Sequence, residues 1–361
     1  MWIVSYGTQS ISIMNALRSL LLLSTLLLTG CIAPGYYLHM AAGQWQVMLS
    51  REPVDEVLAD PEQPLQLKGA LTRSQQMRQF AIAQLKLPDG DSYQHYATID
   101  RPYVQWAVSA TERFSLQPKR WCFPVVGCLA YRGFFSQQRA EAFAQSLREQ
   151  GLDVALHPVP AYSSLGWWGD PLLSTTIHWP EADLARLIFH EMAHEKLYLP
   201  GDTDFNESYA EAVAQLGVAQ WLSQGGKEEK LNRFAAQKKR RKAFRSLIFK
   251  LRDQLQILYT KPLKEAEMAR QKLDLYVQFQ HRYYQLRQSW QGGGHYDHWV
   301  FAKDLNNAKI SMLSHYTRWV PSFKRLFAKS HGDWSTFHHA AETLSHESAP
   351  ERQTALEQYL P

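Results

Sequence analysis

Two pairs of side chains that can bind metal ions, each spaced four residues apart, constrain the fold of this chain more than any other feature. His190 and His194 form the first pair, and Glu207 and Glu211 form the second. A spacing of four places both members of a pair on one face of an α-helix. Residues 200–202, which read PGD, favour a turn between them. The sequence therefore predicts two helices joined by a turn that brings the two pairs together.

The first of these helices has a start signal and an apolar face. Pro180 suits the first turn of a helix, and Leu184 and Ile188 follow at helical spacing. Glu191 comes directly after His190, so the segment reads H-E-x-x-H. In this arrangement two imidazoles bind zinc and the glutamate transfers protons. We therefore expect one zinc ion per chain, with Glu191 as the general base.

The second helix, predicted to start near Asp204, supplies the carboxylates. Folding the turn back would bring Glu207 to the metal as a third ligand. Two histidines and one carboxylate leave a fourth position open for water, as catalytic zinc requires. Glu211, one turn further on, could accept the spare ring N–H of a ligand histidine. The alternative is a chance H-E-x-x-H whose histidines lie on the surface.

Four segments carry a resemblance to known families. "HEMAH" followed by "NESYAE" resembles the gluzincin metallopeptidases, whose third ligand is the Glu of an N-E motif on the following helix. Twelve residues separate His194 from Glu207, fewer than in the thermolysin-like members. The chain more closely resembles a family of bacterial predicted aminopeptidases, in the zinc region and in "WCFPVVGCLAYRGFF", "SSLGWWGDPLLSTTI" and "LNNAKISMLSHYTRWVPSFKRLF". That resemblance implies exopeptidase activity on peptides.

The rest of the site needs groups that hold substrate and stabilise the oxyanion. Before the zinc helix, Trp168 and Asp170 are candidates for substrate binding, with Asp170 gripping the free α-amine; the alternative for the tryptophan is simple packing. Tyr316 is the expected oxyanion donor, in the C-terminal segment that resembles the aminopeptidase family, and His315 is the alternative. Tyr209 is a weaker candidate because it lies off the zinc-facing side of its helix.

The first thirty residues read as an export signal. An apolar stretch covers residues 20–28 and is too short to span a bilayer comfortably. "LTGC" then resembles a bacterial lipobox, so we expect cleavage before Cys31 and lipid on its side chain and new N-terminus. The alternative is a plain membrane anchor. Met1 and Met14 are both possible starts. We expect a bacterial envelope lipoprotein, anchored in the outer membrane and facing the periplasm.

Cys122 and Cys128 remain for structure, six residues apart. In an oxidising compartment they can form a disulfide around a small loop. Two inert core thiols are the alternative, because a short loop can strain the bridge.

The charge of the chain is mild. A formal net charge of +5 does not indicate nucleic-acid binding. The basic run "KKRRKAFR" at 238–245 precedes apolar residues at helical spacing, so we interpret it as the solvated face of a long amphipathic helix. Contact with anionic lipid headgroups is the other interpretation.

The predicted fold is α+β and mostly helical. A zinc-binding helix–turn–helix packs beside a small β-sheet, and long C-terminal helices follow. "YRGFF", a helix after Ser136 and "LDVALHPV" predict a β-α-β unit. Long helices break at Pro262, and a final helix covers 306–327. The predicted regions are a signal peptide (1–30), a membrane-proximal segment (31–70), a metallopeptidase core (71–222) and a helical region that completes the catalytic domain (223–361).

These features together predict a zinc-dependent peptidase with peptide substrates and a lipid attachment to the membrane. The family resemblance alone implies that it is an aminopeptidase. Two other functions stay open. One is an envelope endopeptidase or amidase that uses the same zinc site. The other is a non-catalytic lipoprotein that binds a partner through its long helices.

Overall fold

The computed structural model describes residues 34–123, 127–161, 164, 169–224, 228–290, 294–315 and 318–360. The chain divides into two units, one ending at Gln46 and one beginning at Val47. Helix α2 (Pro34–Leu49) is the described element of the first unit and extends just past this boundary. None of the helices in the described ranges is both long and apolar enough to span a bilayer.

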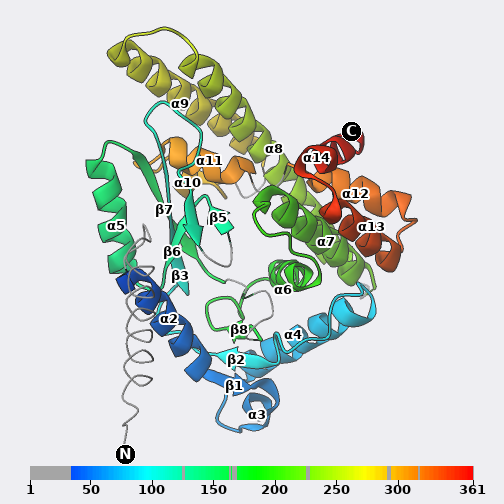
Figure 1. The fold of residues 1–361 in the computed structure, drawn as a ribbon. Helices are drawn as coiled ribbons and strands as arrows, with labels where there is room; N and C mark the ends of the chain where they lie inside the picture. Colours follow the sequence, from blue (N-terminus) through cyan, green and yellow to red (C-terminus); the bar gives the residue numbers. More distant parts are fainter. Residues whose placement is uncertain are drawn as a thin grey trace, which may run out of the picture. The chain divides into compact units, whose positions relative to one another are not determined.

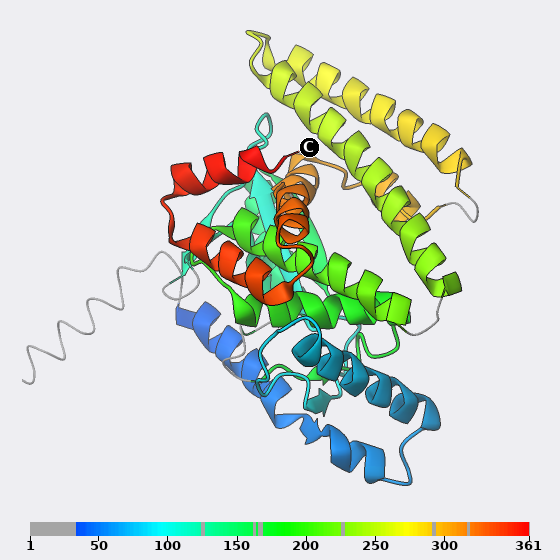
Figure 2. The same cartoon turned by 90° about the vertical axis from the view of Figure 1, so that its right-hand side faces the viewer.

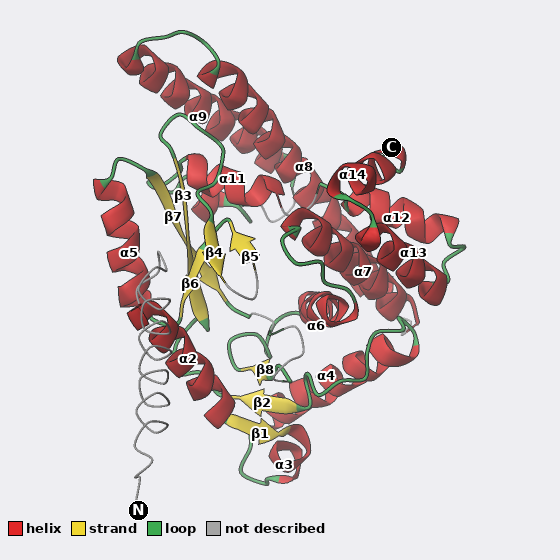
Figure 3. Ribbon diagram, viewed as in Figure 1, coloured by secondary structure: helices red, strands yellow, loops and turns green. Residues whose placement is uncertain are grey.

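The described chain is mostly helical and carries three small sheets, so the predicted α+β class is confirmed (Figure 3). From Arg51 its elements are β1 (Arg51–Pro53), α3 (Val54–Ala59), α4 (Leu65–Ala83), β2 (His95–Ala97), β3 (Gln105–Thr111), β4 (Trp121–Phe123), β5 (Gly127–Leu129), β6 (Arg132–Phe134), α5 (Gln137–Glu149), β7 (Asp153–Val159), β8 (Leu172–Leu173), α6 (Glu181–Lys196), α7 (Thr203–Gln224), α8 (Glu228–Tyr259), α9 (Glu265–Gln288), α10 (Asp297–Val300), α11 (Asn307–His315), α12 (Val320–Lys329), α13 (Trp334–His346) and α14 (Ala349–Gln358).

One sheet, in the order β6-β3-β7, contains the predicted β-α-β unit. Ser136 caps α5 by accepting a hydrogen bond from the backbone N–H of Arg139, and β6 and β7 both pair antiparallel with β3. Successive side chains of a strand point to opposite faces. Phe134 packs on Phe143 of α5 on one face, whereas Ala107 and its partner His157 belong to the other. The face that carries Ala107 and His157 is thus turned away from α5 and can line a site.

Helices α6 and α7 pack tightly and form the centre of the large hydrophobic core (Figure 1). On α6 Leu184 and Ile188, which the sequence predicts on the apolar face, are no more than 2 % exposed, and so is the neighbouring Phe189. Gly217 of α7 allows the close approach, because a Cβ there would lie 2.6 Å from Leu85 Cδ1 and 3.0 Å from Phe189 Cδ2. The two site-bearing helices are thus held rigidly by packing.

The long helices are α8 and α9, which form a hairpin broken near Pro262 as expected (Figure 2). The C-terminal part differs from the prediction. A single helix over 306–327 is wrong, since α11 ends at His315 and α12 begins at Val320. Helices α12, α13 and α14 are short and pack together, with α12 against α7. Strand β8 is short, and its residues Leu172 and Leu173 pair with β2.

Candidate metal centre

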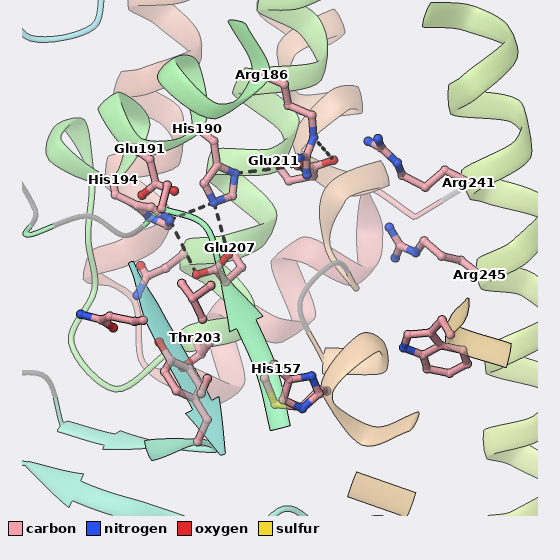
Figure 4. A pocket seen from close by; sticks show the side chains of 18 of the residues that line it. His157, Arg186, His190, Glu191, His194, Thr203, Glu207, Glu211, Arg241 and Arg245 are labelled. Atoms are coloured by element: carbon pink, nitrogen blue, oxygen red, sulfur yellow. Dashed lines mark hydrogen bonds and ion pairs between the residues drawn. The ribbon is translucent and has the colours of Figure 1, made fainter. Parts of the chain in front are cut away.

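Three side chains from α6 and α7 converge on one point. His190 Nε2 lies 3.2 Å from His194 Nε2 and 3.4 Å from Glu207 Oε2. His194 Nε2 lies 3.7 Å from Glu207 Oε1. The ligand atoms of the three residues all fall within 4.8 Å of one another, so the group can hold a metal ion (Figure 4). The two four-residue spacings thus meet across the turn.

The turn between α6 and α7 is fixed by side chains of its own sequence. Asn206 accepts a hydrogen bond from the backbone N–H of Leu199 and donates one to the carbonyl of the same residue, both at 2.8 Å. Asp202 accepts from the N–H of Phe205 and pairs with Arg352 of α14 at 2.7 Å. The asparagine next to Glu207 therefore sets the angle at which the carboxylate enters the site.

Glu211 lies beside the metal-binding group and is bound elsewhere. Its Oε2 is 3.8 Å from His190 Nδ1, too long for a hydrogen bond. Its carboxylate accepts instead from the guanidinium of Arg186 and, at 2.6 Å, from Gln215 Nε2. Burial raises the pKa of Glu211, but the adjacent Arg186 outweighs it and the pKa falls to about 2. Glu211 is therefore a fixed negative charge one turn behind Glu207.

Burial changes the pKa values of Glu191 and His194. It raises the pKa of Glu191 to about 7, although the charge of His190 lowers it. It also lowers the pKa of His194 to about 4, helped by His190. His194 is thus neutral near pH 7, which is the form that can bind a metal.

The donor set suits zinc. Two imidazole nitrogens and one carboxylate are common ligands of catalytic zinc. The Nδ1 atoms of His190 and His194 are buried and make no hydrogen bond, and the two Nε2 atoms face each other and Glu207 at close range. A cation bound among them would relieve this crowding of donor atoms. The residues present therefore fit the metal.

A cavity of about 800 Å³ adjoins the group. Helices α6, α7 and α8 line it, together with the free face of the sheet through Ala107 and His157. Glu191 and Tyr198 also line it, and the ring of Tyr198 lies 6.4 Å from that of His194. The cavity is large enough to admit a short peptide beside the three converging side chains.

A disulfide-linked hairpin lies against the turn. Cys122 of β4 and Cys128 of β5 are joined by a disulfide and are direct partners in register. A Cβ at Gly127 would lie 3.6 Å from the backbone of Gly201, so the hairpin approaches the α6–α7 turn closely. Leu129 of the same hairpin lines the cavity.

Asp170, the residue expected to bind a free amine, is buried in its own loop. Its side chain is buried and accepts a 2.7 Å hydrogen bond from the backbone N–H of Ser164. Its own N–H and carbonyl bond to Ser92 and Tyr93. Asp170 is not among the described residues that line the cavity, so its amine-binding role stays a prediction. Within the described residues its carboxylate stabilises its own loop.

Of the other candidate residues, one lies in the core and the rest fall outside the described residues or side chains. Tyr209 is fully buried and its hydroxyl bonds to His338 Nδ1 at 2.7 Å, so it does not face the cavity. Tyr316, Trp168 and Cys31 lie outside the described residues, as do the side-chain positions of His315.

Sequence reasoning missed three arginines and one tyrosine. Arg186, Arg241 and Arg245 line the cavity. The spacing of four residues between Arg241 and Arg245 could have indicated that they share one helix face. Both belong to the basic run that the sequence analysis interprets as a solvated helix face. Figure 4 shows both reaching from α8 towards Glu211 and the metal-binding group. Tyr198 stands beyond the end of α6, where helical spacing gives no guide.

One family model matches residues 35–356, and its description is "Putative aminopeptidase". The chain belongs to this family. No curated protein and no solved structure matches it. The family match covers the metal-binding group, the sheet and the α8–α9 hairpin, and it supports a peptidase-like activity.

Proposed function

We propose that this protein is a zinc-dependent peptidase of the gluzincin type, with aminopeptidase activity as its family description suggests. The observation that carries the proposal is the convergence of His190, His194 and Glu207 beside Glu191 in one cavity. A structural zinc site usually has four protein ligands. Three ligands next to a carboxylate in a cavity indicate a site built for hydrolysis.

The chain's own residues divide the chemistry. Zinc, when bound, supplies a Lewis acid that lowers the pKa of water and polarises a carbonyl. The Glu191 carboxylate takes the proton of the attacking water and passes it to the leaving amine. The hydroxyl of Tyr198, beside His194 and Glu207, is the described group best placed to donate a hydrogen bond to the developing oxyanion.

Metal analysis and peptide hydrolysis test this proposal together. We expect about one zinc per purified chain, hydrolysis that a chelator abolishes and zinc restores, and severe zinc loss in His190→Ala, His194→Ala and Glu207→Ala. His281→Ala, at an exposed histidine of α9, is the matched control and should keep its zinc. If Glu207→Ala keeps both zinc and activity, the third ligand is misassigned.

Peptides with free and blocked amino termini separate the two peptidase classes. Cleavage that requires the free amine supports aminopeptidase activity, and equal cleavage of the blocked peptide indicates an endopeptidase. If the unmodified protein binds zinc and cleaves neither, the catalytic proposal is wrong.

We also propose that the protein is a lipoprotein of the bacterial envelope, attached through Cys31 and facing the periplasm. The "LTGC" segment supports this, and the Cys122–Cys128 disulfide is typical of an oxidising compartment. Cys31→Ser should abolish labelling by a fatty-acid probe in growing cells. Unchanged labelling would refute lipidation at this residue.

A further inference from the structure

A second cavity adjoins the one beside the metal centre. It has a volume of about 940 Å³ and lies between α8 and α12. Seven lysine and arginine side chains line it against two aspartates. Arg241 and Arg245 line both cavities. The basic run of α8 therefore forms a strongly positive wall that continues into the cavity beside the candidate metal centre.

Arg245 has no anionic partner of its own. Within the described ranges it makes no hydrogen bond and no ion pair, and its guanidinium lies over the ring of Phe249. The side chain of Arg245 is half-buried, and burial lowers its pKa. Glu211 raises this pKa, whereas the neighbouring Arg241 and Arg186 lower it further. A partly desolvated cation without a counter-charge is costly, so this group favours an anionic ligand.

The nearby acids do not meet this demand. Glu211 is already bound by Arg186 and Gln215. Arg241 has a distant ion pair, 3.9 Å from Asp183. Three guanidinium groups thus gather around one occupied carboxylate, and Figure 4 shows two of them extending into the cavity.

Lys324 of α12 adds positive charge to the second cavity, on the side opposite α8. It donates to Gln215 Oε1, and burial together with the adjacent Lys238 lowers its pKa to about 7. Groups with perturbed pKa values cluster at functional sites, and a cluster of cations attracts an anion.

We propose that Arg241 and Arg245 bind a carboxylate of the peptide substrate, either its C-terminal carboxylate or an acidic side chain. This rests on the proposed peptidase function. A planar guanidinium fits a carboxylate in a two-point hydrogen bond, which a neutral substrate group cannot replace. A peptide that lies over His190, His194 and Glu207 can place such a group against α8, because one cavity joins them. The substrates are therefore short or acidic peptides.

Binding can be measured without turnover. Calorimetry on zinc-loaded Glu191→Gln would compare three ligands: an alanine tripeptide with a free carboxyl terminus, its C-terminal amide, and the amide with glutamate in its third position. We expect one of the two carboxylate peptides to bind at least about 10-fold more tightly than the neutral amide. Arg245→Ala, in the same background, should weaken that peptide by about 10- to 100-fold and leave the amide within about 2-fold.

Controls keep the result specific. Arg233→Ala removes an exposed arginine of the same helix, outside both cavities, and should change nothing. Arg245→Lys keeps the charge and should recover part of the preference, which separates charge loss from misfolding. The titration is repeated on metal-free protein to distinguish binding by the arginines from binding by the metal. If the preference for the carboxylate is lost when zinc is removed, the carboxylate binds the metal and the proposal is overturned.

Hydrolysis kinetics complete the test. In the active enzyme Arg245→Ala should raise KM for the preferred peptide with little change in kcat. A carboxylate preference in binding without cleavage of any peptide would refute the peptidase function and leave the anion site standing. Equal binding of all three peptides, or a preference that survives Arg245→Ala and Arg241→Ala, would refute the anion site alone.

Discussion

At the scale of single residues, the proposal depends most on the difference between Glu191 and the three side chains around it. Glu191→Gln keeps the shape and polarity of the side chain but cannot take a proton. We expect it to retain zinc near full occupancy and to lower kcat by about 10²-fold or more. Metal analysis and steady-state kinetics on the same preparation check both parts. Loss of zinc from Glu191→Gln would make this residue a ligand.

His338 makes the stability of the fold depend on pH. Its Nδ1 accepts from the Tyr209 hydroxyl and its Nε2 donates to the Leu85 carbonyl, so the neutral ring is fully bonded. Burial is the main reason that the pKa of His338 falls to about 4. The charge of Lys196 also lowers this pKa, whereas the hydrogen bond to Leu85 and the charge of Asp333 raise it.

The sign of this pH dependence follows from the lowered pKa. Between about pH 6.5 and pH 4 the unfolded chain binds a proton at this position and the folded protein does not. The free energy of unfolding should therefore decrease as pH falls through this range, by at most about 3 kcal/mol. Denaturant titrations at several pH values would show a shallower dependence in His338→Gln than in the unmodified protein. Identical pH profiles would contradict the assignment.

At the scale of helices and strands, the sequence correctly predicted the features that depend on interactions between residues close together in the chain. The α6–α7 pair, the cap at Ser136 and the break near Pro262 follow from helical spacing, capping and proline, and all appear in the structure. The expectation of one final helix over 306–327 was wrong because continuous apolar spacing concealed the start signal of Pro321, which lies in the first turn of α12.

Side-chain partners across the chain could not be predicted in this way. Asp170 is polar and lies before α6, so it was predicted to bind substrate. Its backbone N–H donates to the hydroxyl of Ser92, 78 residues away, a contact that no local pattern reveals. Arg245 was predicted to be solvated, because a basic run usually forms the exposed face of a helix. It lines the cavity only because of the way α8 packs in the folded protein.

Gly217 provides a test of the packing between α6 and α7. Gly217→Ala gains about 1 kcal/mol in helix propensity. It also pushes a methyl group against Leu85 and Phe189, both fully buried, at a cost of about 1–3 kcal/mol. We expect a net loss of stability on thermal denaturation. Gly69→Ala in α4 is the matched control, because its Cβ would meet an arginine side chain at an ordinary 3.5 Å, and it should stabilise. Equal stabilisation by both changes would mean that α6 and α7 tolerate a wider separation.

At the scale of the whole second unit, the α8–α9 hairpin is tied to the sheet by Asn307. This side chain is fully buried. Its oxygen accepts from the hydroxyls of Tyr259 and Tyr276, at 2.9 and 2.8 Å. Its nitrogen donates to the carbonyls of Arg113 and Ser115. One amide thus joins α8, α9 and α11 to the end of β3, and the positive wall of α8 keeps its place partly through this contact.

Asn307→Leu keeps the volume and removes every one of these side-chain bonds. The hydroxyls of the buried Tyr276 and the partly buried Tyr259 would lose their acceptor, and two carbonyls would lose a donor. Leaving buried polar groups unpaired is more costly than the bonds themselves are worth, so we expect the free energy of unfolding to fall by about 2–4 kcal/mol. Tyr259→Phe removes a single partner and should cost about 1 kcal/mol. If Asn307→Leu is as stable as the unmodified protein, another contact holds the hairpin, and the placement of Arg241 and Arg245 beside the metal centre needs a different explanation.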